Sequence, residues 1–138
     1  ARFLQLEDLI VFTGRVSHDE VQKYYSLIDI APLPRKGLRV CELVSPLKPF
    51  EAMGSGKVLV TSSVQALAEI VQDGITGLVF EKDNSQDLAE KLEIPLLDEN
   101  LRSEIGTNAN KWVKENHSWE VISERVTKIY DKILEDKR

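Results

Sequence analysis

The sequence has 138 residues, which is enough for one domain with a buried core and too few for two domains of ordinary size. Hydrophobic residues at 42% and charged residues at 30% exclude a disordered chain, and the net charge of −5 argues against a general nucleic-acid binder. Because Cys41 is the single cysteine, an internal disulfide framework and a cysteine-cluster zinc site are excluded. A single thiol that needs no partner fits a reducing compartment, so we expect a cytoplasmic protein. No apolar run approaches the about 20 residues that span a bilayer.

The first 80 residues alternate short apolar runs with helical periodicity. Buried strands are predicted over residues 10–13, 29–33, 58–61 and 76–80. Helices are predicted over residues 18–27, 49–53 and 66–72, the first of them capped by Ser17. Strands that are separated by helices and are almost continuously apolar indicate a parallel sheet with helices on both faces. We therefore predict a Rossmann-like α/β fold.

After residue 80 the pattern is helical only, so the C-terminal third is predicted to be all-helical. Asp83 and Asn84 are candidates to cap the first of these helices. Three apolar stripes, which we interpret as core contacts, follow at residues 88–92, 101–113 and 119–133. Four parallel strands are fewer than the usual about five or six of a doubly wound sheet. We therefore expect residues 1–138 to form a single partial domain.

The segment 35–57 is positively charged within an acidic chain, with five basic residues and two acids. Such a segment suits a small anion, and it is equally well interpreted as a solvated loop. Pro49 suits the first position of a helix. The amides of Leu47, Lys48, Phe50 and Glu51 would then converge on one point and attract phosphate, and the Lys48 ammonium would add a charge.

The carboxylate of Glu51, two residues into that helix, is open to two interpretations. It suits the helix dipole as a first-turn acid. It would also accept two hydrogen bonds from a ribose diol, as an acidic residue does in dinucleotide-binding folds.

Residues 45–57 read Ser-Pro-Leu-Lys-Pro-Phe-Glu-Ala-Met-Gly-Ser-Gly-Lys, and together with residues 60–62 and 69–80 they resemble the C-terminal domain of family 4 glycosyltransferases. The resemblance extends to residues 11–16, 24–25, 29–30, 118–120 and 130, and so covers nearly the whole chain. It implies GT-B architecture and the retaining, metal-independent transfer of a sugar from a nucleoside diphosphate sugar. It also implies that no cofactor is needed and that UDP is the favoured nucleotide.

By this resemblance, the Glu51 carboxylate holds the donor ribose, the turn before it meets the sugar or the diphosphate, and the turn at residues 14–16 touches the base. The implied donor-binding residues are Arg15, Val16, Ser45, Pro46, Leu47, Lys48 and Glu51.

The sequence departs from the family in a few places. The family often has another glutamate eight positions before the ribose glutamate, where it contacts the transferred sugar. That position is Leu43 here, and Glu42 precedes it. Either a loop shift lets Glu42 serve as the catalytic-site carboxylate, or the sugar is handled differently. Gly54 and Val58 replace the usual alanine and proline, which should affect stability more than chemistry.

We expect the family's diphosphate-gripping arginine and lysine, and its N-terminal acceptor domain, to lie outside these 138 residues. The chain should then bind the donor without completing transfer, and it should partner that acceptor domain in a full-length enzyme, which could lie at the inner membrane face. Self-association through exposed apolar surface is also expected. The alternative is a non-enzymatic α/β module with a regulatory or protein-binding role.

Overall fold

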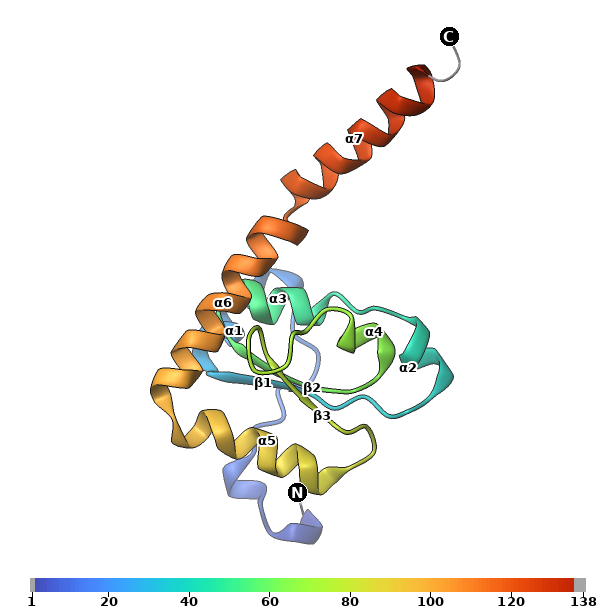
Figure 1. The fold of residues 1–138 in the computed structure, drawn as a ribbon. Helices are drawn as coiled ribbons and strands as arrows, with labels where there is room; N and C mark the ends of the chain where they lie inside the picture. Colours follow the sequence, from blue (N-terminus) through green and yellow to red (C-terminus); the bar gives the residue numbers. More distant parts are fainter. Residues whose placement is uncertain (1, 136–138) are drawn as a thin grey trace.

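The computed structural model describes residues 2–135 and contains a parallel sheet with helices packed on both faces (Figure 1). Its strands are β1 (Ile30–Leu33), β2 (Val58–Ser62) and β3 (Leu78–Phe80), in the order β1-β2-β3. The register pairs Ala31 with Leu59 and Val60 with Leu78.

The helices include the short 3-10 turns η1 (Arg2–Leu4), η2 (Glu7–Leu9) and η3 (His18–Glu20). The α-helices are α1 (Val21–Leu27), α2 (Arg39–Leu43), α3 (Lys48–Gly54), α4 (Gln65–Ala68), α5 (Ser85–Leu97), α6 (Glu99–His117) and α7 (Trp119–Glu135). The predicted α/β fold, with its parallel sheet and helical C-terminal part, is confirmed.

Strand β2 is buried along its whole length because it lies between two apolar clusters. Side chains of a strand alternate between the two faces of its sheet. On one face Leu59 belongs to a cluster with Met53 of α3 and Leu67 of α4. On the other face Val60 belongs to a cluster with Ile105 of α6. This central strand explains why residues 58–61 carry the clearest strand signal in the sequence.

Residues 10–13, predicted to be a strand, have no regular structure. The exposed fractions of Val11 and Phe12 are 87% and 79%. A strand needs a neighbour to complete its backbone hydrogen bonds, and no described strand pairs with this segment. The prediction of a fourth strand is therefore wrong for the described part of the chain.

A tight turn over residues 72–77 shortens two predicted elements. The Gln72 amide donates to the Thr76 hydroxyl at 3.0 Å, and the Gly74 amide donates to the Gly77 carbonyl at 2.8 Å. Gly74 has a φ of +76°, a conformation that favours glycine. Consequently α4 ends at Ala68 instead of residue 72, and β3 begins at residue 78 instead of residue 76.

The predicted helix caps are confirmed in part. The Asn84 side chain accepts hydrogen bonds from two amides of the first turn of α5, as an N-cap does. Asp83 has a different role, because its carboxylate accepts from the Gly37 amide at 2.9 Å. Ser17 occupies the predicted N-cap position of η3, the 3-10 turn that precedes α1, but its hydroxyl donates to the Glu20 carboxylate at 3.2 Å and caps no amide of that turn.

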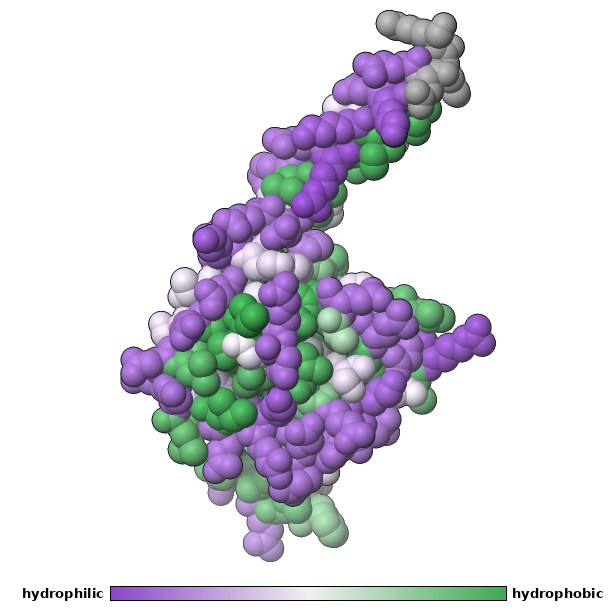
Figure 2. Space-filling model, in the orientation of Figure 1, coloured by the Kyte–Doolittle hydropathy of each residue, from purple (hydrophilic) through white to green (hydrophobic). Residues whose placement is uncertain are grey.

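Helix α7 continues beyond α6 and projects away from the sheet (Figure 1). None of its residues is buried, and Trp119 is 77% exposed. Figure 2 shows hydrophobic side chains among the polar ones on this projecting helix. The helix itself is predicted correctly, but the interpretation of its apolar stripe as a core contact is wrong, because the stripe stays largely exposed.

The ring of His117, at the end of α6, lies beside the rings of Phe50 and Trp112, with centroids 4.7 Å away in both cases. Burial, and then the positive charge of Arg125, hold the pKa of His117 below its ordinary value of 6.5. The folded chain therefore binds this proton less readily than the unfolded chain does.

We expect the stability contributed by neutral His117 to be complete above pH 6.5 and to be lost as the pH falls through the lowered folded pKa. Urea unfolding followed by circular dichroism, at a series of pH values on both sides of 6.5, measures this loss. The variant His117→Phe should lose this part of the pH dependence, whereas His18→Phe should keep it. An unchanged pH profile in His117→Phe would contradict the prediction.

Candidate functional site

Parallel strands end at the same edge of the sheet, so the loops that follow β1, β2 and β3 lie together at one edge. Helix α3 leads into the start of β2, and it therefore begins near that same carboxyl edge. Open parallel sheets bind their ligands outside the carboxyl ends of the strands. The start of α3 is thus well placed to contact a ligand.

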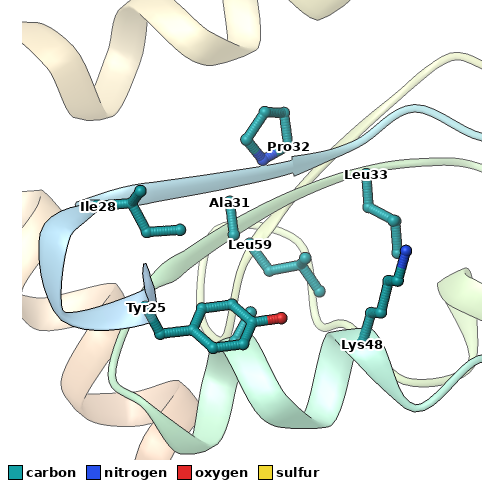
Figure 3. A pocket seen from close by; sticks show the side chains of 8 residues that line it. Tyr25, Ile28, Ala31, Pro32, Leu33, Lys48 and Leu59 are labelled. Atoms are coloured by element: carbon teal, nitrogen blue, oxygen red, sulfur yellow. The ribbon is translucent and has the colours of Figure 1, made fainter. Parts of the chain in front are cut away.

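A cleft of about 270 Å³ lies between β1 and helices α1 and α3 (Figure 3). We call it the β1–α3 cleft, and its lining residues are Tyr25, Ile28, Ala31, Pro32, Leu33, Lys48, Ala52 and Leu59. Figure 3 shows the Lys48 amine beside Leu33, near the end of β1, and the Tyr25 hydroxyl pointing into the cleft. The cleft therefore combines apolar walls with one cation and one hydroxyl.

Glu51 follows Lys48 by one helical turn, and its carboxylate lies next to this hydroxyl. The Tyr25 hydroxyl donates to Glu51 Oε2 over 3.5 Å, which is long for a hydrogen bond. Burial, and then the negative charge and hydrogen bond of Glu51, raise the pKa of Tyr25, so the hydroxyl stays protonated and can donate. The other carboxylate oxygen has no protein partner among residues 2–135. It is available to accept hydroxyls from a ligand.

Three of the four amides that were predicted to be free at the start of α3 have no protein acceptor among residues 2–135, and the fourth is engaged in the helix. Because α3 begins at Lys48, the Leu47 carbonyl is the first acceptor of the helix, and the Glu51 amide donates to it at 3.2 Å. The Glu51 amide is therefore not free, contrary to the prediction. The amides of Leu47, Lys48 and Phe50 find no protein acceptor within the described chain.

A second hollow of about 210 Å³ adjoins the β1–α3 cleft, because Tyr25 and Ile28 line both. Val16 also lines this hollow. The structure thus brings Val16, Lys48 and Glu51 together around Tyr25. Arg15 lines neither hollow, and its side chain is exposed.

The predicted residues 45–47 form the turn that leads into α3 and do not line the cleft. Ser45 and Leu47 are exposed, and Pro46 is half-buried. The turn therefore offers its backbone at the rim.

Residues 1–112 match the family described as Glycosyl transferases group 1. The chain belongs to this family. It is 30% identical over 131 residues to an uncharacterized glycosyltransferase of Methanocaldococcus jannaschii, a match that covers 91% of this chain and 31% of the relative. The chain spans about a third of the length of the curated relatives that it matches.

Two solved structures share the fold of this group 1 family member. The C-terminal domain of the group 1 glycosyl transferase LpcC from Francisella tularensis superposes with a TM-score of 0.73 at 25% identity, covering 86% of this chain and 58% of that one. Anabaena HepE in complex with UDP superposes with a TM-score of 0.75 at 21% identity, and the match covers 95% of this chain and 34% of the HepE chain. These likenesses confirm the predicted fold class.

Tyr25 is a polar residue of the candidate site that the sequence analysis did not predict. It follows Val21 by four residues and precedes Ile28 by three, and all three side chains line the second hollow. That spacing marks one face of a helix. This spacing could have placed Tyr25 on the inner face of the helix, but it does not distinguish a residue that lines a cleft from a residue of the core.

Glu42, the candidate sugar-contacting carboxylate, lies on α2 and does not line the β1–α3 cleft. Its Oε2 accepts from the Gln65 amide at 2.7 Å, and its Oε1 accepts from the Lys82 ammonium at 2.5 Å. The Lys82 hydrogen bond, and then the Gln65 amide, hold the pKa of Glu42 below its ordinary value of 4.5. A catalytic role for Glu42 stays a prediction.

Across residues 2–135 of this family member, no three histidine, cysteine, aspartate or glutamate side chains are grouped so that they could hold a metal ion. Nor does that part of the chain contain a helix with the length and apolar character needed to cross a bilayer.

Proposed function

We propose that this chain is the donor-binding part of a retaining, metal-independent glycosyltransferase of family 4 with GT-B architecture. One observation carries the proposal: Lys48 and Glu51 of α3 lie beside Tyr25 at the β1–α3 cleft, by the carboxyl edge of the sheet. A cation suits a diphosphate, and a carboxylate with an unpaired oxygen suits a ribose diol. Both parts of a nucleoside diphosphate sugar thus find a chemical partner on one helix.

The remaining donor contacts follow from the placement of the other residues. Val16 lines the adjoining hollow, so we propose that the nucleobase lies there with Arg15 at its rim. The free amides at the turn before α3 would meet the diphosphate or the sugar. The complex of Anabaena HepE with UDP supports UDP as the nucleotide.

We also propose that an N-terminal acceptor domain completes the enzyme. At about 270 Å³, the β1–α3 cleft is smaller than the roughly 300–1,000 Å³ of typical ligand pockets. The likeness to a C-terminal domain, and the coverage of a third of the relatives, support a role as one half of a two-domain cleft. Without the other half, water is not excluded and transfer is not expected. We propose a cytoplasmic enzyme that lies at the inner face of the membrane in its full-length form.

A titration with UDP, followed through backbone amide chemical shifts, tests the proposal. We expect weak binding, with a Kd on the order of millimolar, or about 4 kcal/mol. The shifts should cluster at residues 15–16 and 45–51, because Val16 lines the second hollow and residues 45–51 form the turn into α3 and the first residues of that helix. Uridine without phosphates is the control, and it should shift residues 15–16 more than residues 45–51. Shifts confined to α6 and α7, or no binding of any nucleotide, would favour the regulatory or protein-binding module.

A further inference from the structure

The segment 34–47, which joins β1 to α3, is fastened to the ends of the two other strands. The Arg35 amide donates to the Ser62 hydroxyl at 3.2 Å, at the end of β2. The Gly37 amide donates to the Asp83 carboxylate at 2.9 Å, just after β3. Because this segment leads directly into α3, the hydrogen bonds that hold the segment also determine where the start of α3 lies.

Glu42 holds the same segment through two further hydrogen bonds, one to each of its carboxylate oxygens. One oxygen accepts from the amide of Gln65, the first residue of α4, at 2.7 Å. The preceding residue, Val64, has no side chain that could cap this helix. Glu42 therefore supplies, from α2, the acceptor that a serine or an aspartate would supply at an ordinary N-cap. The other oxygen accepts from Lys82 after β3, at 2.5 Å.

The contact with Lys82 also neutralises a charge. The Glu42 side chain is 23% exposed, and its lowered pKa keeps it a carboxylate. An unpaired carboxylate at the edge of the sheet would repel a diphosphate.

We propose that Glu42 is a positioning residue: together with Lys82 it clamps α2 to α4 and to the end of β3, and thereby sets the turn at residues 45–48 against the donor. The connection to that turn is short. The Val44 carbonyl, immediately before the turn, accepts from the Arg35 guanidinium at 2.6 Å. The inference rests on the proposed function, since the turn is expected to contact the donor.

The first test needs no ligand. The variants Glu42→Ala and Lys82→Met each remove the ion pair, and Lys91→Met is the matched control because Lys91 pairs with Asp73 at 3.4 Å, away from α2. Amide chemical shifts of the whole chain report the backbone. We expect both clamp variants, and not the control, to shift the amides of residues 47–48.

Glu42→Gln gives a second, milder variant in case Glu42→Ala does not fold, because it keeps an oxygen for the Gln65 amide and loses the charge. It should shift the amides of residues 47–48 less than Glu42→Ala does. If the Gln65 amide shifts in a folded Glu42 variant while residues 47–48 stay unchanged, Glu42 holds α4 alone and the proposal is overturned.

The second test compares UDP with UDP-glucose. If Glu42 is a positioning residue, either clamp variant should weaken the binding of both ligands by the same factor, about threefold to tenfold. The double variant should bind no more weakly than Glu42→Ala. Weakening of UDP-glucose alone, with Lys82→Met unaffected, would instead make Glu42 a sugar-contacting residue. If the unaltered chain binds neither ligand, the proposed function fails, and the amide shifts still decide whether the clamp sets the turn.

Discussion

Replacing Gly106 with alanine is expected to lower the free energy of unfolding by about 1–3 kcal/mol, the usual cost of overpacking a core. Gly106 is buried on α6, and a Cβ there would meet the backbone of Gly56, with the carbonyl carbon at 3.2 Å and the oxygen nearer still. Backbone atoms cannot rotate away as a side chain can. The better helix propensity of alanine, about 1 kcal/mol, should offset only part of this cost.

Gly54→Ala is the matched control, because a Cβ there would meet its nearest neighbour, Val113 Cγ1, at an ordinary 3.8 Å. We expect stability to change by at most about 0.5 kcal/mol, as at an unstrained site. Urea unfolding of both variants, followed by circular dichroism, makes the comparison. Equal stability of the two variants would show that α6 can move away from the turn at Gly56 without cost.

Glu51→Gln is expected to weaken UDP binding by about 1–3 kcal/mol, in the range for hydrogen bonds to a charged group. The carboxylate oxygen that has no protein partner is the one proposed to accept the ribose hydroxyls. Glutamine keeps an oxygen for the Tyr25 hydroxyl, so the fold should barely change. In the amide-shift titration of the chain, saturation by UDP should be lost within the accessible concentration range.

Glu115→Gln is the control for this experiment, because Glu115 forms an exposed pair with Lys111 on α6, at 4.0 Å. It should leave both UDP binding and stability unchanged. A lower unfolding midpoint in Glu51→Gln, with UDP shifts like those of the unaltered chain, would make Glu51 a structural residue.

The strands are predicted correctly where another described strand pairs with them. Strand β2 is predicted correctly because its continuous apolar run is typical of a strand that is buried on both faces of the sheet. Residues 10–13 are just as apolar, yet they form no strand because pairing depends on a partner and not on local composition. The stripe of α7 likewise predicts a helix but does not predict what, if anything, covers it.

The same distinction applies to the candidate site. Lys48 and Glu51 are one turn apart, so their proximity follows from a local pattern. Tyr25 reaches Glu51 across 26 positions of the sequence, and Lys82 reaches Glu42 across 40. Contacts of this kind arise from the packing of α1 and β3 against their neighbours, and spacing alone does not reveal them.

The projection of α7 has a consequence for optical measurements. The chain has two tryptophans, and they fall on the two sides of the junction between α6 and α7. Trp112 packs against the apolar cluster that includes Leu59, whereas Trp119 is 77% exposed at the start of α7. Trp119 is therefore largely hydrated before unfolding begins. The change in tryptophan fluorescence on unfolding should come mainly from Trp112. An unfolding curve measured in this way therefore reports the loss of the sheet and the helices packed on it, and it hardly detects the unfolding of α7.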